Sequence, residues 1–148
     1  MEHQVIVFKL SREEYAASIT EVKEIVRYQK INRIPNTPVY VEGVINLRDK
    51  IFPVIDLKKR FNLGSSEIED QTRIIIIELG NINVGLIVDS VEEVLRIGEE
   101  NIDDVPKTLV SIDTKFISGI AKVGDRIITM LNLQEVFNAA EKTELEAV

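Results

Sequence analysis

The sequence contains no cysteine and no tryptophan, and only one histidine. Without cysteine there is neither a disulfide framework nor a thiolate metal site, which suits a protein of a reducing compartment. The single histidine, His3, lies near the N-terminus, so a histidine-based catalytic triad and a multi-histidine metal cluster are excluded. We therefore assign no catalytic residue, no metal ligand and no cofactor.

Long apolar runs and excess positive charge are lacking as well. The isoleucine run at 74–77 is far shorter than the roughly 20 residues that a membrane span requires, and residues 1–4 do not read as the start of a signal peptide. The formal net charge of −7 repels phosphate backbones and anionic lipid surfaces. We expect a soluble cytoplasmic protein that neither inserts into a membrane nor binds nucleic acid.

What the sequence does contain is aliphatic and β-branched. Apolar residues make up 45% of the 148 residues, whereas aromatic residues make up 5%. The core must then consist mainly of isoleucine, valine and leucine, and β-branched side chains pack well on a pleated strand. Such runs predict strands at 5–10 and 15–19, joined by a polar turn, and again at 74–79 and 84–88. The sequence predicts an all-β fold.

The two hairpins indicate an internal repeat: identities are sparse enough for a chance resemblance between two strand-rich segments, but the matching order of two blocks favours a real repeat. Leu10 corresponds to Leu79 at an offset of 69 residues, and in a later block Gly43 corresponds to Gly119 at an offset of 76. The extra residues of the second copy fall in the polar stretch 98–115, where insertions cost little. Each copy holds about five short strands, enough for a small barrel. We predict two barrels sharing a core, with subdomain 1 over about 15–65 and subdomain 2 over about 74–137.

Helix content is predicted to be low. A turn or two is expected at 57–61, and a longer C-terminal helix is expected from about residue 133. That last segment has one apolar stripe at helical spacing, formed by Leu133, Val136, Phe137 and Ala140. Such a stripe more often packs on its own domain than on a partner.

Carboxylates do not form a convincing catalytic pair. Adjacent acidic residues occur at 92–93, 99–100 and 103–104, but neighbouring side chains on a strand point to opposite faces. A solvated acidic surface explains them better. Neither a glycine-rich phosphate loop nor an EF-hand spacing occurs. The sequence therefore predicts that the protein is not an enzyme.

The most informative segment runs over residues 35–57. It reads as a rigid proline-rich entry, a strand, a tight charged turn at 48–50 and a second strand. The other copy has Gly124 at the position of Arg48, so the turn itself does not require an arginine. Arg48 is either a solubilising turn residue or a recognition residue that holds a carboxylate in a bidentate pair.

Residues 38–48, PVYVEGVINLR, and residues 53–61, PVIDLKKRF, closely resemble the central motif of chemotaxis coupling proteins, the CheW family. Residues 85–95, GLIVDSVEEVL, resemble the same family, and the resemblance extends from about residue 5 to 137. Asp49 departs from it, because the family usually has glycine there. The resemblance implies two intertwined five-stranded SH3-like β-barrels. We expect these barrels to be followed by the short C-terminal helix that the apolar stripe predicts.

The resemblance also implies an adaptor with two partners. These are the cytoplasmic tip of a transmembrane chemoreceptor and the regulatory domain of the chemotaxis histidine kinase, so the protein would be recruited to receptor arrays. Glu24 and Arg48 are expected to form an ion pair or polar cluster. The implied receptor-binding residues are Val22, Glu24, Arg48, Gly85, Val88 and Val91, and the implied kinase-binding residues are Ile25, Ile31, Gly43 and Arg48. The simpler alternative makes Val22 a core residue and Glu24 a solvated one.

Other functions remain open at this stage. The same fold occurs within the kinase and in coupling proteins fused to a receiver domain, but two barrels account for the 148 residues, so we expect a stand-alone adaptor. A binding module of another two-component pathway is a second possibility. A nucleic-acid-binding small barrel would need a basic, aromatic-bearing face, which this composition opposes. A carboxylate-based hydrolase is the least favoured.

Overall fold

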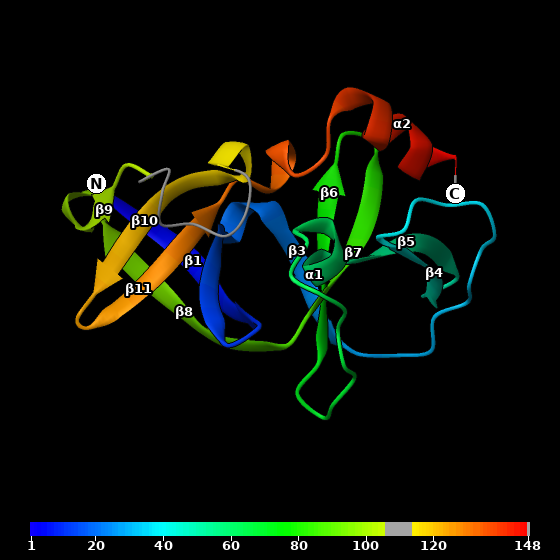
Figure 1. Cartoon of the computed structure of the whole chain (residues 1–148), viewed down its shortest axis with the longest axis horizontal. Helices are drawn as coiled ribbons and strands as arrows, with labels where there is room; N and C mark the ends of the chain where they lie inside the picture. The colour runs from blue at the N-terminus through cyan, green and yellow to red at the C-terminus, as the bar shows by residue number, and fades with distance from the viewer. Residues whose placement is uncertain (106–113, 148) are drawn as a thin grey trace.

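The computed structural model describes residues 1–105 and 114–147. Within them the chain forms two β-sheets that lie at opposite ends of an elongated molecule, with the N-terminus at one end and the C-terminus at the other (Figure 1). The all-β prediction is confirmed. Part of the polar stretch 98–115, where the insertion between the repeat blocks is expected, lies outside the described residues, at 106–113.

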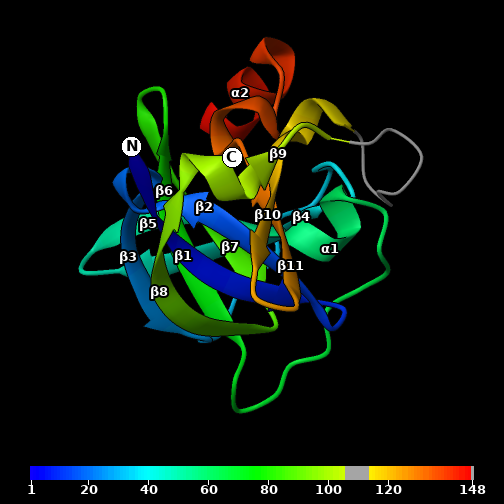
Figure 2. The same cartoon turned by 90° about the vertical axis from the view of Figure 1, so that its left-hand side faces the viewer.

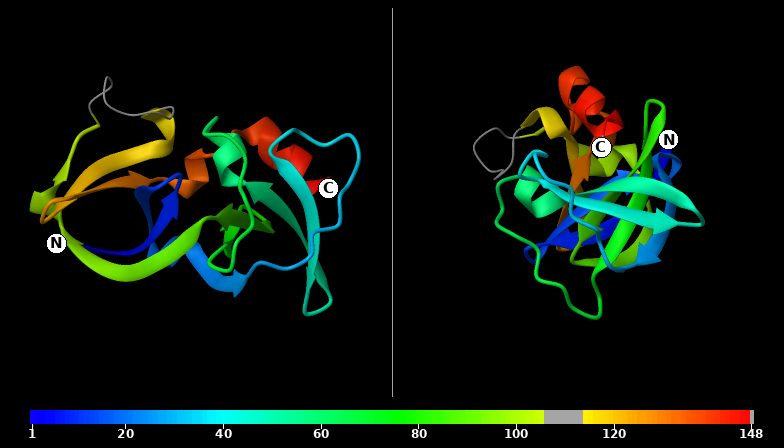
Figure 3. Two further views of the ribbon diagram at one scale, coloured as in Figure 1. Left: turned by 60° about the horizontal axis from the view of Figure 1, so that its bottom comes forward. Right: turned by 90° about the vertical axis from the view of Figure 1, so that its right-hand side faces the viewer.

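Sheet A contains, in spatial order, β8 (Ser90–Gly98), β1 (Glu2–Leu10), β2 (Glu13–Ser18), β11 (Arg126–Leu131), β10 (Ile117–Val123) and the two-residue β9 (Ile102–Asp103). Sheet B contains β3 (Val22–Arg27), β6 (Arg73–Leu79), β7 (Ile82–Val88), β5 (Lys50–Asp56) and β4 (Val41–Leu47). Both sheets curl strongly, as Figure 2 shows for sheet A and Figure 3 for sheet B.

The helical segments are short. They are the 3-10 turns η1 (Ile19–Glu21), η2 (Glu99–Asn101), η3 (Thr114–Phe116) and η4 (Leu133–Glu135), and the helices α1 (Leu57–Arg60) and α2 (Ala139–Glu146). The predicted turn of helix at 57–61 is confirmed by α1. Among the described residues, no helix has the length and apolar character needed to cross a membrane.

Each sheet combines segments from both copies of the repeat. Sheet A takes the hairpin β1–β2 from the first copy and β8, β10 and β11 from the second. Sheet B takes the hairpin β6–β7 from the second copy and β3, β4 and β5 from the first. The parallel pairs β2–β11 and β5–β7 join the copies. The barrels are therefore intertwined, and neither sheet coincides with the range 15–65 or 74–137.

The strand registers repeat in the same way as the sequence. Met130 lies opposite Ala16 in sheet A, and Val54 lies opposite Gly85 in sheet B. These two pairs correspond under the offsets of 69 and 76 residues. The hairpins β4–β5 and β10–β11 also carry a register shift at corresponding places, beside Gly43 and Gly119. The internal repeat predicted from the sequence is thus a repeat of structure.

Among the described residues, three apolar clusters hold the sheets together: one inside sheet A, one inside sheet B and a larger one between them. Strand β6 contributes to two of these clusters. Ile74 and Ile76 face the interior of sheet B, whereas Ile75 and Ile77 face the shared core, because successive side chains of a strand point to opposite faces. Each fully buried isoleucine stabilises the fold by roughly 1.5–3 kcal/mol.

The C-terminal segment differs from the single helix predicted from about residue 133. A capping box interrupts it: the Asn138 side chain accepts from the Glu141 N–H at 2.8 Å, and the Asn138 N–H donates to the Glu141 carboxylate at 2.9 Å. This arrangement satisfies N–H groups that lack helical partners, so α2 begins only after Asn138. Of the predicted stripe, Ala140 is exposed, whereas the buried members are Leu133, Val136 and Phe137.

Arg60 at the end of α1 anchors this C-terminal segment. Its Nη2 donates to the Val136 carbonyl at 2.6 Å and to Glu141 Oε1 at 2.9 Å. The guanidinium also lies 5.1–5.2 Å from the ring centroids of Tyr40, Phe116 and Phe137. These contacts attach the chain after sheet A to the end of sheet B.

Candidate partner-binding surface

Glu24 and Arg48 form an ion pair that joins β3 to the tip of the β4–β5 hairpin. Arg48 Nη1 donates to Glu24 Oε1 at 3.1 Å, and Nη2 donates to Oε2, so the contact is bidentate. Strands β3 and β4 are the two edge strands of sheet B and form no hydrogen-bonded pair with each other. The Glu24–Arg48 ion pair therefore connects the two open edges of the curled sheet. The two residues expected to form one cluster therefore lie in direct contact.

A two-residue turn presents the arginine. Arg48 and Asp49 have φ angles of 52° and 63°, a left-handed pattern that suits a tight hairpin. Gly124, the counterpart of Arg48, has a φ of 62°. A non-glycine residue costs conformational free energy in this region. An arginine at this left-handed position therefore costs conformational free energy. This cost favours a specific role for the Arg48 side chain, because a residue needed only for solubility could stand at a position without strain.

Each partner of the pair fixes the charge of the other. The hydrogen bond from Arg48 lowers the pKa of the Glu24 carboxyl, and the bond to Glu24 raises the pKa of Arg48. The Arg48 side chain is 64% exposed and that of Glu24 is 32% exposed. The surface thus offers a docking protein an ionised carboxylate and a guanidinium with further N–H donors.

Val22 and Val91 occupy equivalent places in the repeat, at the start of β3 and near the start of β8. Both are half-buried and pack against the shared core between the sheets. Each can therefore contribute to packing and to a surface at the same time. The core alternative for Val22 is correct in part.

Gly85 and Val88 on β7 lie in the interior. Val88 is fully buried in the shared core. A Cβ atom on Gly85 would lie 2.7 Å from Ile74 Cγ2, so glycine is needed for packing. Their burial gives both residues a packing role, and the surface proposed below leaves them out as contact residues.

Ile25, Ile31 and Gly43 are not equally accessible. Ile25 points outward from β3 and is 39% exposed, whereas Ile31 is half-buried against the interior of sheet B. Gly43 is buried: a Cβ atom there would lie 2.1 Å from the Asn32 carbonyl oxygen, and its φ is 148°. The absence of a side chain lets Asn32 pair with Val44 through two backbone hydrogen bonds of 2.8 and 2.9 Å. Gly43 therefore shapes the surface, and Ile25 is exposed on it.

The structure adds a cluster in sheet A that the sequence reasoning missed. Arg126 donates to Glu14 from Nε at 3.0 Å and from Nη2 at 2.5 Å, and its Nη2 lies 3.0 Å from Glu93. This hydrogen bonding lowers the pKa of Glu14 and raises that of Arg126. Glu93 is the repeat counterpart of Glu24 at the offset of 69, so the repeat carried a signal for this cluster.

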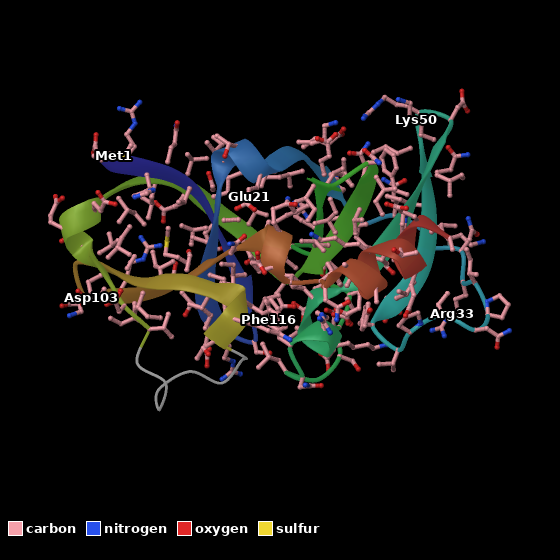
Figure 4. The ribbon with its side chains drawn as sticks, turned by 90° about the horizontal axis from the view of Figure 1, so that it is seen from above. Met1, Glu21, Arg33, Lys50, Asp103 and Phe116 are labelled. Atoms are coloured by element: carbon pink, nitrogen blue, oxygen red, sulfur yellow. The ribbon has the colours of Figure 1, made fainter. Side chains whose placement is uncertain are left out.

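Exposed apolar residues also follow the repeat. Ile25 and Val94 correspond at an offset of 69, and Ile51 and Ile127 correspond at an offset of 76. Their exposed fractions are 39%, 52%, 58% and 57%. Figure 4 labels Lys50 at the outer tip of the β4–β5 hairpin, one residue before Ile51. In each sheet, exposed apolar residues therefore lie next to members of the ion pair in sequence: Ile25 follows Glu24, and Ile127 follows Arg126.

Among the residues that the structure describes, histidine, aspartate and glutamate side chains nowhere gather as a metal-binding group of three or more. The site is a surface of charged and apolar side chains. The family model of the CheW-like domain matches residues 4–141. The chain belongs to the CheW-like family.

Relatives in the CheW-like family cover nearly the whole chain. The chemotaxis protein CheW of Bacillus subtilis (strain 168) is 41% identical over 135 residues, covering 91% of this chain and 86% of that protein. The chemotaxis protein CheW of Helicobacter pylori is 38% identical over 133 residues, covering 90% and 80%. The crystal structure of the scaffolding protein TtCheW from Thermoanaerobacter tengcongensis matches with a TM-score of 0.85 and 44% identity, covering 95% of this chain and 91% of that one.

Proposed function

We propose that this chain is a chemotaxis adaptor that couples transmembrane chemoreceptors to the chemotaxis histidine kinase. The observation that carries the proposal is the exposed bidentate Glu24–Arg48 pair at the hairpin tip of a CheW-like fold. A surface of this kind suits recognition of another protein, because charged pairs fix register and apolar neighbours supply buried area. We further propose that the protein acts in the cytoplasm, at receptor arrays, without catalysing a reaction.

Two overlapping parts of the surface would serve the two partners. The receptor tip would contact Val22, Glu24, Arg48 and Val91, which include the half-buried valines beside the shared core. The kinase regulatory domain would contact Ile25 and Arg48 on sheet B, with Ile31 and Gly43 shaping the strand pairing behind them. Arg48 is placed in both because it projects from the hairpin tip.

Co-sedimentation tests the proposal directly. The chain would be mixed with receptor cytoplasmic fragments assembled on vesicles, with and without the kinase, and kinase autophosphorylation would be measured in the same samples. We expect the chain to pellet with the receptor, to carry the kinase with it and to raise autophosphorylation only when receptor is present. Binding to neither partner, or turnover of a substrate by the chain alone, would contradict the proposal.

A further inference from the structure

Two arginines lie directly opposite each other where β3 ends and β6 begins. In the antiparallel pairing of these strands, Arg27 is the register partner of Arg73, and Ile25 is the partner of Ile75. The Cβ atoms of directly opposite residues lie about 4.5–5.5 Å apart, and like charges in such a pair destabilise a sheet. The stability of sheet B alone therefore does not account for the arginine pair.

Neither arginine has an ion-pair partner among the residues that the structure describes. Arg27 is exposed, and its side chain forms no hydrogen bond to any of them. Arg73 Nη1 donates to the Asp70 carbonyl at 2.8 Å and to the Thr72 carbonyl at 2.9 Å. These uncharged acceptors hold the guanidinium of Arg73 in place but do not neutralise it, and they leave its other N–H groups as donors.

The carboxylates of the same two strands are already paired with other cations. Glu24 on β3 binds Arg48, and Glu78 on β6 binds Lys23. The chain as a whole carries a net charge of −7, so acidic residues are in excess over basic ones. Even so, the positive charge at the end of β3 is not compensated within the described part of the chain.

The arginine pair adjoins the exposed apolar residue of the surface proposed for the kinase. Residues two apart on a strand share a face, so Ile25 and Arg27 lie on one face of β3, and both are exposed. Ile75, opposite Ile25, is buried in the shared core, so this face of sheet B reaches the surface at its edge strand β3. Val22, a proposed receptor contact, lies at the other end of β3.

The corresponding place in sheet A lacks the second arginine. At the offset of 69, Arg27 corresponds to Arg96, whereas Arg73 corresponds to Gln4. Gln4 lies opposite Arg96 in the pairing of β1 with β8, as Arg73 lies opposite Arg27 in sheet B. The pair of like charges is therefore a property of sheet B, and sheet A offers a matched control.

We propose that the kinase regulatory domain places a carboxylate side chain against Arg27 and Arg73, next to an apolar side chain that covers Ile25. The inference rests on the proposed function and gives the chemistry of the kinase contact. A carboxylate fits because it accepts two parallel N–H groups from a guanidinium and because an anion offsets the repulsion between two cations. Burial of the adjacent Ile25 excludes water and strengthens the charged contact.

Arg27→Glu tests the proposal on a side chain that contributes no described contact to the fold. The new carboxylate lies opposite Arg73, so the isolated variant is expected to unfold at the same temperature as wild type or higher. Its affinity for the kinase regulatory domain, measured by calorimetry, is expected to fall at least about tenfold, since repulsion replaces attraction. Affinity for the receptor fragment should stay within about twofold. Arg27→Lys keeps the charge and should bind the kinase within about threefold of wild type.

The repeat and the salt dependence supply the controls. Arg96→Glu makes the same change at the counterpart in sheet A and should leave kinase affinity within about twofold of wild type. Raising the salt concentration from about 0.1 to 0.5 M should weaken kinase binding of the wild type but not of Arg27→Glu. Unchanged kinase affinity of Arg27→Glu, an equal loss in Arg96→Glu, or a loss of receptor binding instead would overturn the inference. Failure of the wild-type chain to bind the kinase would instead overturn the proposed function.

Discussion

Glu93 occupies in sheet A the position that Glu24 occupies in sheet B, and each binds an arginine at the tip of the facing hairpin. The arginines themselves are not counterparts. Arg126 corresponds to Lys50, whereas Arg48 corresponds to Gly124. The two copies therefore bring a guanidinium to the same place from different turn positions, so the geometry of the sheet decides where the cation has to lie.

Arg48→Ala is expected to leave thermal stability nearly unchanged, because Arg48 is exposed and its left-handed backbone gains nothing from the side chain. Affinity for the partner that covers the pair should fall at least about tenfold, since a buried charged contact is lost in the complex. Calorimetry with each partner separately measures this. Glu24→Ala should be non-additive with Arg48→Ala. Wild-type binding of both partners together with full kinase activation would return Arg48 to a solvated turn residue.

Asp49→Gly should stabilise the protein by about 1 kcal/mol, because a left-handed φ of 63° strains any residue with a Cβ atom. Denaturant titration would show the change as a higher midpoint. Asp125→Gly in the β10–β11 turn is the matched control, since Asp125 does not have a positive φ and should gain nothing. Equal effects of the two substitutions would show that the strain at Asp49 is negligible.

Arg126→Ala should destabilise the protein by roughly 1 kcal/mol at neutral pH, a value reduced for the partial exposure of the cluster. Hydrogen bonding to Arg126 lowers the pKa of Glu14 below its usual 4.5. The stabilisation is therefore present above that value and is lost as the pH falls through the lowered pKa. Urea titrations from neutral to acidic pH should show that the free energy of unfolding falls less on acidification in the variant than in the wild type. Lys122→Ala, which breaks an exposed pair with Asp103, is the control.

Arg60→Ala should destabilise the protein by about 2–4 kcal/mol, because it removes three cation–π contacts and the partly buried ion pair with Glu141. Hydrogen exchange should become faster in α2, where Leu145 is buried. Lys142→Ala on the same helix provides the comparison. Unchanged exchange in α2 would mean that Arg60 does not hold the helix in place.

Gly43→Ala should destabilise the protein by roughly 3 kcal/mol or more, since the new methyl group would overlap the Asn32 carbonyl. Gly124→Ala has open space around it and should cost only about 1 kcal/mol for its positive φ. Thermal unfolding of both variants separates the two cases. A Gly43→Ala protein with wild-type stability but no kinase binding would make Gly43 a contact residue rather than a packing residue.

The hairpins and the repeat could be predicted because they depend on local patterns. The isoleucine run of β6 and its polar turn define a hairpin without reference to the rest of the chain, and the offsets of 69 and 76 residues reproduce the observed registers. The Glu24–Arg48 cluster followed from the resemblance of its motif to a known family. Which hairpin joins which sheet depends on long-range pairing, and the family resemblance indicated only that the barrels are intertwined.

Burial and capping were harder to predict. The family resemblance implied that Val88 faces the receptor, but it ends an apolar run, residues 84–88, that is buried throughout. The apolar spacing from Leu133 continues through Asn138, but the side-chain hydrogen bonds of Asn138 restart the helix.

The exchange of hairpins between the two sheets has the topology of a domain-swapped dimer whose two chains have been joined end to end. Two separate single-copy chains could close both sheets only by trading β1–β2 for β6–β7. Joining the two copies in one chain lets the two sheets vary independently in sequence, since a residue can be substituted in one copy and kept in the other. The repeat counterpart of Arg48 is Gly124, and that of Asn83 is Glu14. A symmetric dimer of identical chains could not contain such differences between its two sheets.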